Sequence, residues 1–341
     1  IDKSSDFFNT VLYTGTGSEL AITGVGFQPD WVWTKSRSNT LNHNVYDSVR
    51  GVNKGLKPNT TDSEFNDAQS LKSFNSDGFT VGTDSHINTS SATFASWNWK
   101  AGTSFTNDAS STGIGSIDSA GSVNTDAGFS IVSYTGNSTS GATVGHGLGA
   151  VPKMILIKNI SATENWIVYH TALGNTKNLY LDATNGEDTR SNTFNNTSPT
   201  SSVFSIGNAS GVNNSGNSMI AYCFADVQGY SKFGSYTGNG NADGTFVYTG
   251  FKPAFVMIKR TNDTRNWIIL DNKRNTDDNP YNTELEANTN NAEGTNIRFD
   301  SLSNGFKLRL ASGASNASSS PYIYMAFAEN PFTTSTGVPA T

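Results

Sequence analysis

The side chains best suited to proton transfer or metal binding near neutral pH are the four histidines of this 341-residue chain, His43, His86, His146 and His170. None stands in a metal-ligand spacing such as His-x-x-x-His, so we expect no metal site. The serine-rich composition leaves a Ser-His-Asp set open, but no Gly-x-Ser-x-Gly elbow is present. The histidine pattern therefore predicts no catalytic residue.

Acidic residues are the second candidates, because paired carboxylates hydrolyse glycosides when their separation is fixed. Glu286, Glu293, Asp277 and Asp278 share one loop, but nothing in the sequence fixes their separation. The loop does not match an EF-hand, and a loose calcium site stays open. The stretch "GHGLG" at residues 145–149 precedes a strand, whereas phosphate loops precede helices, so we interpret it as a turn. We expect no enzyme and no cofactor, and no binding residue is identified.

The composition excludes several classes of protein. Hydrophobic residues are 35% and charged residues 15%, while aromatics reach 11%, which indicates a folded, loop-rich chain. The net charge is −6 without a basic stripe, so nucleic acid is not expected as a partner. No apolar run reaches the roughly 18–20 residues of a membrane helix, so we expect no membrane insertion. The chain begins at Ile1, which leaves a preceding signal segment open.

One sequence pattern occurs three times, as "GFQPDWVWTK", "GAVPKMILIK" and "GFKPAFVMIK". The lysines that end it are Lys35, Lys158 and Lys259, which are 123 and 101 residues apart. The same offsets separate Asp47, His170 and Asp271. The tripeptide "YTG" begins at Tyr13, Tyr134 and Tyr236, and a final apolar run aligns Trp99, Phe224 and Phe327. Four landmarks in one order indicate three copies of a domain of roughly 100 residues.

The landmarks set the expected boundaries. The three copies span residues 1–103, 127–230 and 231–333, and a tail spans 334–341. Residues 104–126 are rich in Ser, Thr, Gly and Asp and are interpreted as a linker that Ile114, Ile117 and Val123 could pin to a neighbour. The second joint is short, which indicates a stiff connection.

Each copy consists of short β-branched and aromatic runs separated by turn residues, which predicts an all-β chain of three tandem jelly-roll-like β-sandwich domains. Residues 62–74, the best helical candidate, are interpreted as a loop or a single turn. The runs "WVWT", "MILI" and "FVMI" do not alternate, so these strands should be covered on both faces by a sheet, a loop, a sister domain or a sister chain. "SWNWK" does alternate, which predicts a half-buried strand.

The repeated residues favour structural roles. A lysine present in all three copies suggests a requirement of the fold, with its stem on apolar surface and its ammonium near a carbonyl or the repeated Asp. Cys223 is the only cysteine, so no internal disulfide forms, and we expect a buried thiol rather than a nucleophile. The side chains expected in the core of each last strand are Trp97, Trp99, Tyr222, Phe224, Met325 and Phe327.

Several stretches, among them "GVGFQPDWVWTKSR", "SDGFTVGTD", "SWNWKAG" and "AFAENPF", resemble a repeat-domain family of marine tailed phages, such as those of cyanobacteria and Pelagibacter-like hosts. The resemblance covers Asp6 to Phe332. It implies a virion protein of a tail fibre, collar or other appendage, and it brings no catalytic residue. By analogy alone, it also implies a concanavalin-like fold.

The expectation is therefore a non-enzymatic virion structural protein on the particle exterior, in an appendage or decoration, which could adhere to host-surface glycans. Its expected partners are other virion proteins and copies of itself, with a homotrimer favoured because the doubly apolar strands need cover. The alternatives are a secreted carbohydrate-binding or carbohydrate-degrading protein and a bacterial surface adhesin. An enzyme would show an acidic cleft in one copy, and a lectin the same exposed aromatic residue in every copy.

Overall fold

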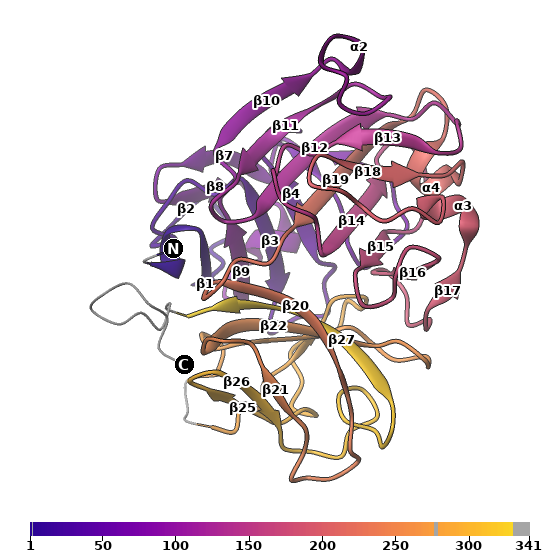
Figure 1. The fold of residues 1–341 in the computed structure, drawn as a ribbon. Coiled ribbons are helices and arrows are strands. Elements are labelled where there is room, and N and C mark those ends of the chain that lie inside the picture. The colour runs from indigo at the N-terminus through magenta and orange to yellow at the C-terminus, as the bar shows by residue number, and fades with distance from the viewer. Residues whose placement is uncertain (2, 276–278, 330–341) are drawn as a thin grey trace.

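The computed structural model describes residues 1, 3–275 and 279–329 and is all-β, as predicted (Figure 1). The elements of the first copy are η1 Ser4–Asp6, β1 Phe8–Thr14, β2 Leu20–Thr23, β3 Trp31–Ser36, β4 Asn44–Asp47, β5 Lys54–Gly55, β6 Phe65–Asn66, β7 Leu71–Asn75, β8 Gly78–Val81, α1 Ser85–Asn88 and β9 Thr93–Trp99. Residues 62–74 contain no helix, as expected, but they contain β6 and most of β7 rather than only a loop or turn.

The second copy, with the segment before it, contains β10 Thr103–Asn107, α2 Ala109–Thr112, β11 Ser119–Asn124, β12 Phe129–Thr135, β13 Ala142–Gly145, β14 Met154–Asn159, β15 Ile167–His170, β16 Lys177–Tyr180, β17 Asp188–Thr189, α3 Ser191–Phe194, β18 Val203–Ile206, α4 Ser210–Asn213 and β19 Ser218–Phe224. The third contains β20 Ser231–Thr237, β21 Phe246–Tyr248, β22 Pro253–Arg260, β23 Ile268–Asp271, β24 Leu285–Glu286, β25 Phe299–Leu302, β26 Gly305–Leu308 and β27 Pro321–Ala328.

All three copies share one antiparallel strand order in their main sheet. The orders are β1-β9-β3-β4, then β12-β19-β14-β15-β16, then β20-β27-β22-β23-β24. The strand after the repeated proline is internal in each sheet, between the last strand and the strand that ends in the repeated Asp or His. A small sheet covers one face of each main sheet: β2-β8-β7, β13-β18 and β21-β26-β25. The predicted equivalence and internal position of the post-proline strands are confirmed.

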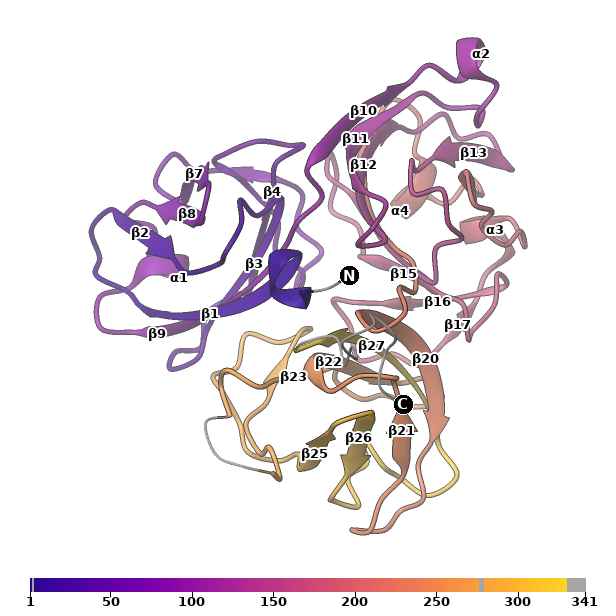
Figure 2. The ribbon, with the colours of Figure 1, turned by 60° about the vertical axis from the view of Figure 1, so that its left-hand side comes forward.

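The other face of each main sheet points to the centre of the molecule. Figure 2 shows the three copies as lobes around this centre. One hydrophobic cluster, called the central cluster below, contains side chains from all three main sheets. Its members include Trp31, Trp33, Trp97, Trp99, Phe129, Met154, Leu156, Tyr222, Phe224, Phe255, Met257, Met325 and Phe327. Three further clusters lie between each main sheet and its own small sheet.

This arrangement explains why the repeated strands are apolar on both faces. In β14, Met154 and Leu156 join the central cluster, while Ile155 and Ile157 join the cluster of their own copy. The strands β3 and β22 divide their side chains in the same way. The cover predicted for these strands is therefore a sister domain of the same chain.

Aromatic contacts cross the central cluster between copies. The rings of Trp31 and Tyr222 stack with centroids 4.7 Å apart, and Trp99 lies 5.7 Å from Phe327. Phe327 also lies 6.2 Å from Phe224. The six side chains predicted as core are all buried. The copies are thus joined by a common core rather than strung as independent domains.

Two expectations need correction. The last strand is not half-buried, because Asn98 is fully buried beside Ser96, whose hydroxyl donates to the Asn98 amide oxygen at 3.1 Å. Residues 104–126 connect the first two copies, but not as a bare linker, since β10 and β11 extend the main sheet of the second copy. Ile117 and Val123 anchor this segment in the cluster of that copy, whereas Ile114 is exposed.

The second joint is short and fixed by polar contacts. Asp226 pairs with Lys232 at 2.8 Å and accepts a hydrogen bond from the backbone N–H of Phe233. The expected tail at 334–341 lies outside the described residues.

Candidate functional site

The histidines lie mostly in the interior. His43, His146 and His170 are buried, and the ring of His86 is partly exposed beside Asp84. Burial lowers the pKa of His146 and of His170 to about 4, and it lowers the pKa of His43 well below its usual range. An enclosed, neutral imidazole does not exchange protons with a substrate. Three of the four histidines therefore have structural roles.

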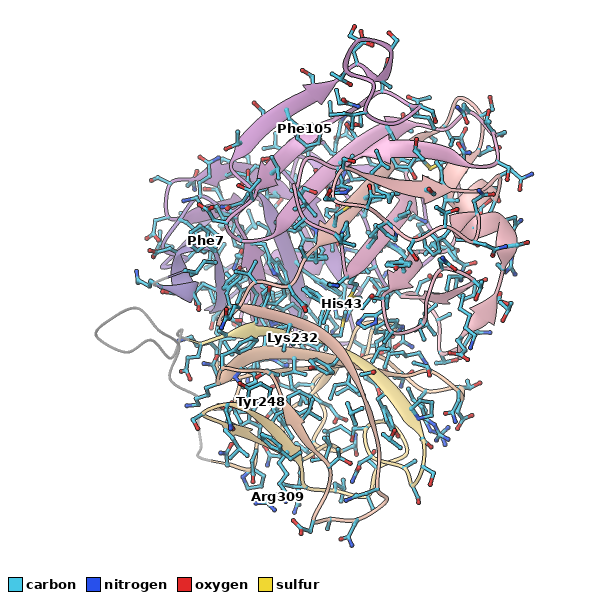
Figure 3. The ribbon with its side chains drawn as sticks, viewed as in Figure 1. Phe7, His43, Phe105, Lys232, Tyr248 and Arg309 are labelled. Carbon is cyan, nitrogen blue, oxygen red and sulfur yellow. The ribbon has the colours of Figure 1, made fainter. Side chains whose placement is uncertain are left out.

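His43 belongs to a threefold set of ring N–H groups that join the copies. The equivalent residues are Trp166 and Trp267. The bonds run from Nε2 of His43 to the carbonyl of Glu286 (3.1 Å), from Nε1 of Trp166 to that of Lys57 (3.0 Å) and from Nε1 of Trp267 to that of Tyr180 (2.8 Å). Trp33 Nε1 donates to Nδ1 of His43 at 2.8 Å, so the His43 proton lies on Nε2. Figure 3 shows His43 in the middle of the molecule.

A second threefold set contains the repeated Asp47, His170 and Asp271. The Tyr222 hydroxyl donates to Asp47 at 2.7 Å, and Trp97 Nε1 donates to Asp271 at 2.9 Å, each bond joining two copies. Met325 is the equivalent of Tyr222 and Trp97 in the third copy, and a thioether cannot donate. At the junction between the second and third copies, the second copy places His170 instead of an aspartate, and Nε2 of His170 lies 3.3 Å from the Tyr324 carbonyl. Because Nδ1 of His170 accepts from the Ala172 N–H, Nε2 is the donor.

Two buried guanidinium groups neutralise the two buried aspartates. Arg50 Nε lies 2.6 Å from Asp47, and Arg274 Nε lies 2.6 Å from Asp271. The equivalent residue next to His170 is Leu173. A buried carboxylate is stable only when it is paired, and a neutral histidine needs no such partner. Each buried aspartate is thus paired with a guanidinium, and the neutral His170 has no charged partner at the equivalent position.

The repeated lysines lie at the same junctions. Each Nζ donates to backbone carbonyls: Lys35 to those of Ser36 (2.6 Å) and Asn39 (3.4 Å), Lys158 to those of Thr61 (2.8 Å) and Glu164, and Lys259 to those of Thr184 (2.9 Å) and Arg265 (2.7 Å). Thr61 and Thr184 belong to the preceding copy. Burial lowers the pKa of each lysine to about 8. The predicted structural role and carbonyl contact are confirmed, and the contact is not with the repeated Asp.

Of the four carboxylates considered for hydrolysis, Glu286 and Glu293 lie in the described residues, and each is held by neighbouring polar groups. Glu293 pairs with Arg37 of the first copy at 2.9 Å and with Arg274 at 3.1 Å. Glu286 accepts hydrogen bonds from Asn266 at 2.6 Å, from Thr289 and from Asn291. Asp277 and Asp278 lie outside the described residues. Burial raises the pKa of the Cys223 thiol, and the turn at residues 145–149 leads into a strand.

The "YTG" landmark forms a lock that sequence reasoning did not identify. The tyrosine hydroxyls of Tyr13, Tyr134 and Tyr236 donate to the carbonyls of Ile87, Val212 and Ser315 at 2.8, 2.7 and 2.6 Å. The residue after each carbonyl is a buried asparagine, Asn88, Asn213 or Asn316. The amide oxygen of each asparagine accepts from the backbone N–H that follows "YTG", and its amide nitrogen donates to a carbonyl six residues before the asparagine. A Cβ on Gly15, Gly136 or Gly238 would lie 2.2–2.3 Å from a backbone oxygen, so these glycines permit the close approach.

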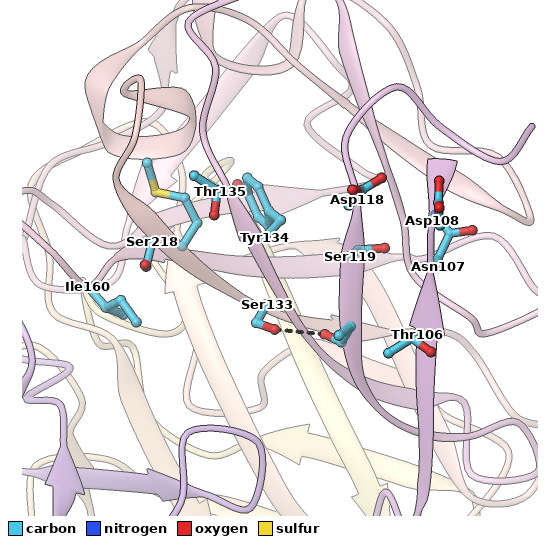
Figure 4. A pocket seen from close by; sticks show the side chains of 12 residues that line it. Thr106, Asn107, Asp108, Asp118, Ser119, Ser133, Tyr134, Thr135, Ile160 and Ser218 are labelled. Atoms are coloured by element: carbon cyan, nitrogen blue, oxygen red, sulfur yellow. Dashed lines mark hydrogen bonds between the residues drawn. The ribbon is translucent and has the colours of Figure 1, made fainter. Parts of the chain in front are cut away.

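A groove of about 500 Å³ lies along β10, β11 and β12 (Figure 4). Its side chains include Thr106, Asp108, Asp118, Ser133 and Ser218. Asp108 caps α2 by accepting from Ser110 and Ser111, and these bonds lower its pKa. The Ser133 hydroxyl donates to the Ala120 carbonyl at 2.9 Å. The residues that line this groove in the described chain include no histidine, cysteine or lysine, and its two carboxylates, Asp108 and Asp118, accept hydrogen bonds from the serines and the backbone of α2.

Two exposed aromatic side chains form a second surface feature that sequence reasoning missed. Phe246 and Tyr248 are 43% and 57% exposed, and both lie on the outer face of β21. The alternation of "FVY", with Val247 buried between them, was the available signal. The corresponding residues are Ala21 and Thr23 in the first copy and Thr143 and Gly145 in the second. The exposed pair is therefore specific to the third copy, unlike the pattern expected for a lectin with three equal sites.

The described residues hold no cluster of three or more His, Cys, Asp or Glu side chains arranged for a metal ion. Within the same residues, no helix has the length and apolar character needed to span a membrane.

These features define an all-β protein in which three copies of one unit surround a shared core. The chain belongs to the family described as a domain of unknown function, DUF7483, whose model matches residues 3–331. One family model thus spans all three copies. No curated protein and no solved structure matches the chain. The family description assigns no function, so the resemblance to phage virion proteins stays a prediction.

Proposed function

We propose that the chain is a non-enzymatic structural protein of a tailed-phage exterior, in a tail fibre, another appendage or a decoration, with a capacity for host-surface adhesion. The observation that carries the proposal is the use of the repeated polar residues. Lys158, Lys259, Asp47, His170 and Asp271 all make contacts between copies, and Glu286 and Glu293 lie in hydrogen bonds and ion pairs. The side chains that could take part in a reaction thus make structural contacts instead.

The packing of each copy supports a jelly-roll or concanavalin-like β-sandwich as its parent fold, since a main sheet faces a small sheet across a hydrophobic cluster. A homotrimer remains part of the proposal, but the apolar pattern of the post-proline strands does not support it. The doubly apolar strands find their cover inside one chain, so they need no second chain.

The proposal is tested on purified particles of a phage that encodes this chain. Antibodies against the folded chain should label the particle exterior in electron micrographs, and the recombinant chain should release no sugar from host-surface glycans. A chain that is absent from purified particles but present in the culture medium contradicts the virion role. Glycan cleavage that disappears in a Glu286→Gln variant contradicts the non-enzymatic role.

A secreted carbohydrate-binding protein is the second candidate, favoured by the exposed Phe246 and Tyr248. A carbohydrate-degrading protein and a bacterial surface adhesin remain further alternatives. The location of the chain separates these candidates, because only the virion protein co-purifies with particles in fixed stoichiometry.

A further inference from the structure

We propose that the outer face of the small sheet in the third copy binds an acidic oligosaccharide, with Phe246 and Tyr248 as the stacking surface and Lys307 and Arg309 as the contacts for a carboxylate or sulfate group. The inference deepens the adhesive part of the proposed function and rests on it. Figure 3 shows Tyr248 and Arg309 in the lobe formed by the third copy, far from His43 at the centre.

The register of the small sheet places these side chains next to one another. Phe246 lies opposite Lys307, and Tyr248 lies opposite Gly305. Residues directly opposite on antiparallel strands share a face, so the aromatic rings and the ammonium group point outward together. Gly305 has no side chain, and a Cβ there would lie 2.1 Å from the Val247 carbonyl oxygen and 3.1 Å from the Phe246 ring, so the glycine permits the close approach of β21 with its exposed rings.

Comparison of the three copies shows which side chains of this small sheet the fold requires and which it does not. The buried positions are alike, because Val247 and Phe306 correspond to Ile22 and Phe79 in the first copy. The outward positions differ. Phe246, Tyr248, Lys307 and Arg309 correspond to Ala21, Thr23, Thr80 and Gly82 in the first copy and to Thr143, Gly145, Ser205 and Gly207 in the second. Two copies fold with small residues at these positions, so packing does not require the aromatic and basic side chains.

The basic side chains of this face are partly exposed, Lys307 to 26% and Arg309 to 40%. Lys307 pairs with Asp243 at 2.8 Å, and Asp243 is 77% exposed in its side chain. Arg309 lies 2.5 Å from Asp300 and 3.5 Å from Asp243. The exposed Arg298 precedes β25, and its carbonyl accepts from the Arg309 N–H. Three cations against two carboxylates give this face a net positive charge on a chain of net charge −6, which complements an acidic ligand.

The mixture of rings and charges favours a sugar over a protein partner. Lysine and aspartate, unlike arginine and the aromatic residues, are depleted at the centres of protein interfaces, whereas this face carries both Lys307 and Asp243. Here Lys307 lies directly opposite Phe246, and the exposed carboxylate of Asp243 offers hydrogen-bond acceptors for hydroxyl groups. Aromatic faces pack against the C–H faces of sugars, and the basic groups make charge-assisted hydrogen bonds to a carboxylate or sulfate.

The test uses the full chain and titration calorimetry with hexasaccharides: galacturonate, mannuronate, sulfated galactose, and the uncharged counterpart of each. At least one acidic hexamer should bind, with an affinity that falls as salt rises. The double variant Phe246→Ala, Tyr248→Thr, which carries the residues of the first copy, should weaken binding at least tenfold. Lys307→Thr should weaken binding of the acidic hexamer about three- to tenfold and reduce its salt dependence.

Val151→Thr is the matched control, because Val151 is 42% exposed in another copy, and this variant should bind as the parent chain does. Thermal melting verifies that each variant is folded, and Tyr248→Thr alone replaces the double variant if the latter melts early. Unchanged binding in both the aromatic and the lysine variants overturns this site and leaves adhesion elsewhere. Equal affinity for acidic and uncharged hexamers also overturns it. If no hexamer binds, or if the face binds only another virion protein, the inference fails while the structural role stands.

Discussion

At the scale of single residues, the occurrence of a residue in all three copies distinguishes a structural role from a catalytic one. A lowered lysine pKa is a feature of catalytic amines, and Lys35, Lys158 and Lys259 all have a pKa lowered to about 8 by burial. However, each ammonium is enclosed and donates to backbone carbonyls, two of the three reaching into a neighbouring copy. The same perturbation in three equivalent junctions indicates that burial at the junction, rather than a reaction, sets the pKa.

The accessibility of these amines gives the first prediction. At pH 8 a catalytic lysine with this pKa would react first with an acylating reagent, because more of it is unprotonated. In the folded chain, Lys35, Lys158 and Lys259 should instead react last, because they are buried. The exposed Lys54 is the internal control. Mass spectrometry after partial acylation measures the order, and early modification of any of the three contradicts the structural assignment.

The buried histidines predict acid sensitivity. His146 and His170 have a pKa of about 4 in the folded chain, below the value of about 6.5 expected when unfolded. As the pH falls below 6.5, the unfolded chain binds protons first, so each histidine removes about 1.4 kcal/mol of stability per pH unit until about pH 4.

Denaturant unfolding at pH 7.5, 6 and 5 should show this loss. His170→Asn keeps an acceptor for the Ala172 N–H and cannot become charged, so its loss between pH 6.5 and 5 should be smaller than that of the parent chain. Equal slopes for the variant and the parent would exclude His170 as a source of the acid sensitivity.

At the scale of elements, the strands could be predicted from the sequence, but the parts of the protein that pack on their two faces could not. The runs "WVWT", "MILI" and "FVMI" correctly indicated cover on both faces, because a strand with one wet face alternates. The identity of the cover was not readable, since a sister domain and a sister chain give a strand the same apolar pattern. "SWNWK" was misread because Asn98 and Ser96 satisfy each other inside the protein, so polar letters did not mean exposure.

The repeated asparagines of the locks could have been found from their spacing alone. Asn88, Asn213 and Asn316 are 125 and 103 residues apart, the same offsets as Trp99, Phe224 and Phe327. Their role was not readable, because it depends on the approach of the "YTG" turn. The linker-like composition of residues 104–126 likewise concealed β10 and β11, whose few apolar side chains suffice because they join an existing sheet edge.

The locks give the element-scale prediction. Asn213→Ala should destabilise the chain by about 1–3 kcal/mol, because the amide donates to the carbonyls of Thr139 and Gly207 and accepts from the Asn137 N–H. Asn214→Ala is the control, since its side chain is exposed one residue further on, and it should change stability by less than about 0.5 kcal/mol. Urea unfolding of both variants measures the difference, and equal effects would rule out the lock.

At the scale of the whole molecule, three copies in one chain can diverge where three identical chains cannot. The junctions pair Asp47 with Tyr222, Asp271 with Trp97, and His170 with the backbone beside Met325. Exchanging one copy for another would leave a buried carboxylate without its donor, which costs several kcal/mol. The order of the copies around the core is thus encoded in the side chains at their junctions.

The shared core makes the final prediction a test of cooperativity. Trp99 lies in the central cluster against Phe8 of its own copy and against Phe255 and Phe327 of the third. Trp99→Ala in the full chain should cost about 3–5 kcal/mol and lower the melting temperature of all three copies together. Calorimetry should give one transition whose calorimetric and van't Hoff enthalpies agree.

An isolated copy should fail to fold, because its half of the central cluster would face water. Residues 103–230, which include β10 and β11 of the second copy's sheet, would alone expose Met154, Leu156, Tyr222 and Phe224, which are buried in the intact chain. Exposure of an apolar surface of this kind removes the main driving force for folding and favours aggregation. Separate melting transitions in the full chain, or a soluble and cooperatively melting fragment 103–230, would contradict a common core and restore the picture of three independent domains.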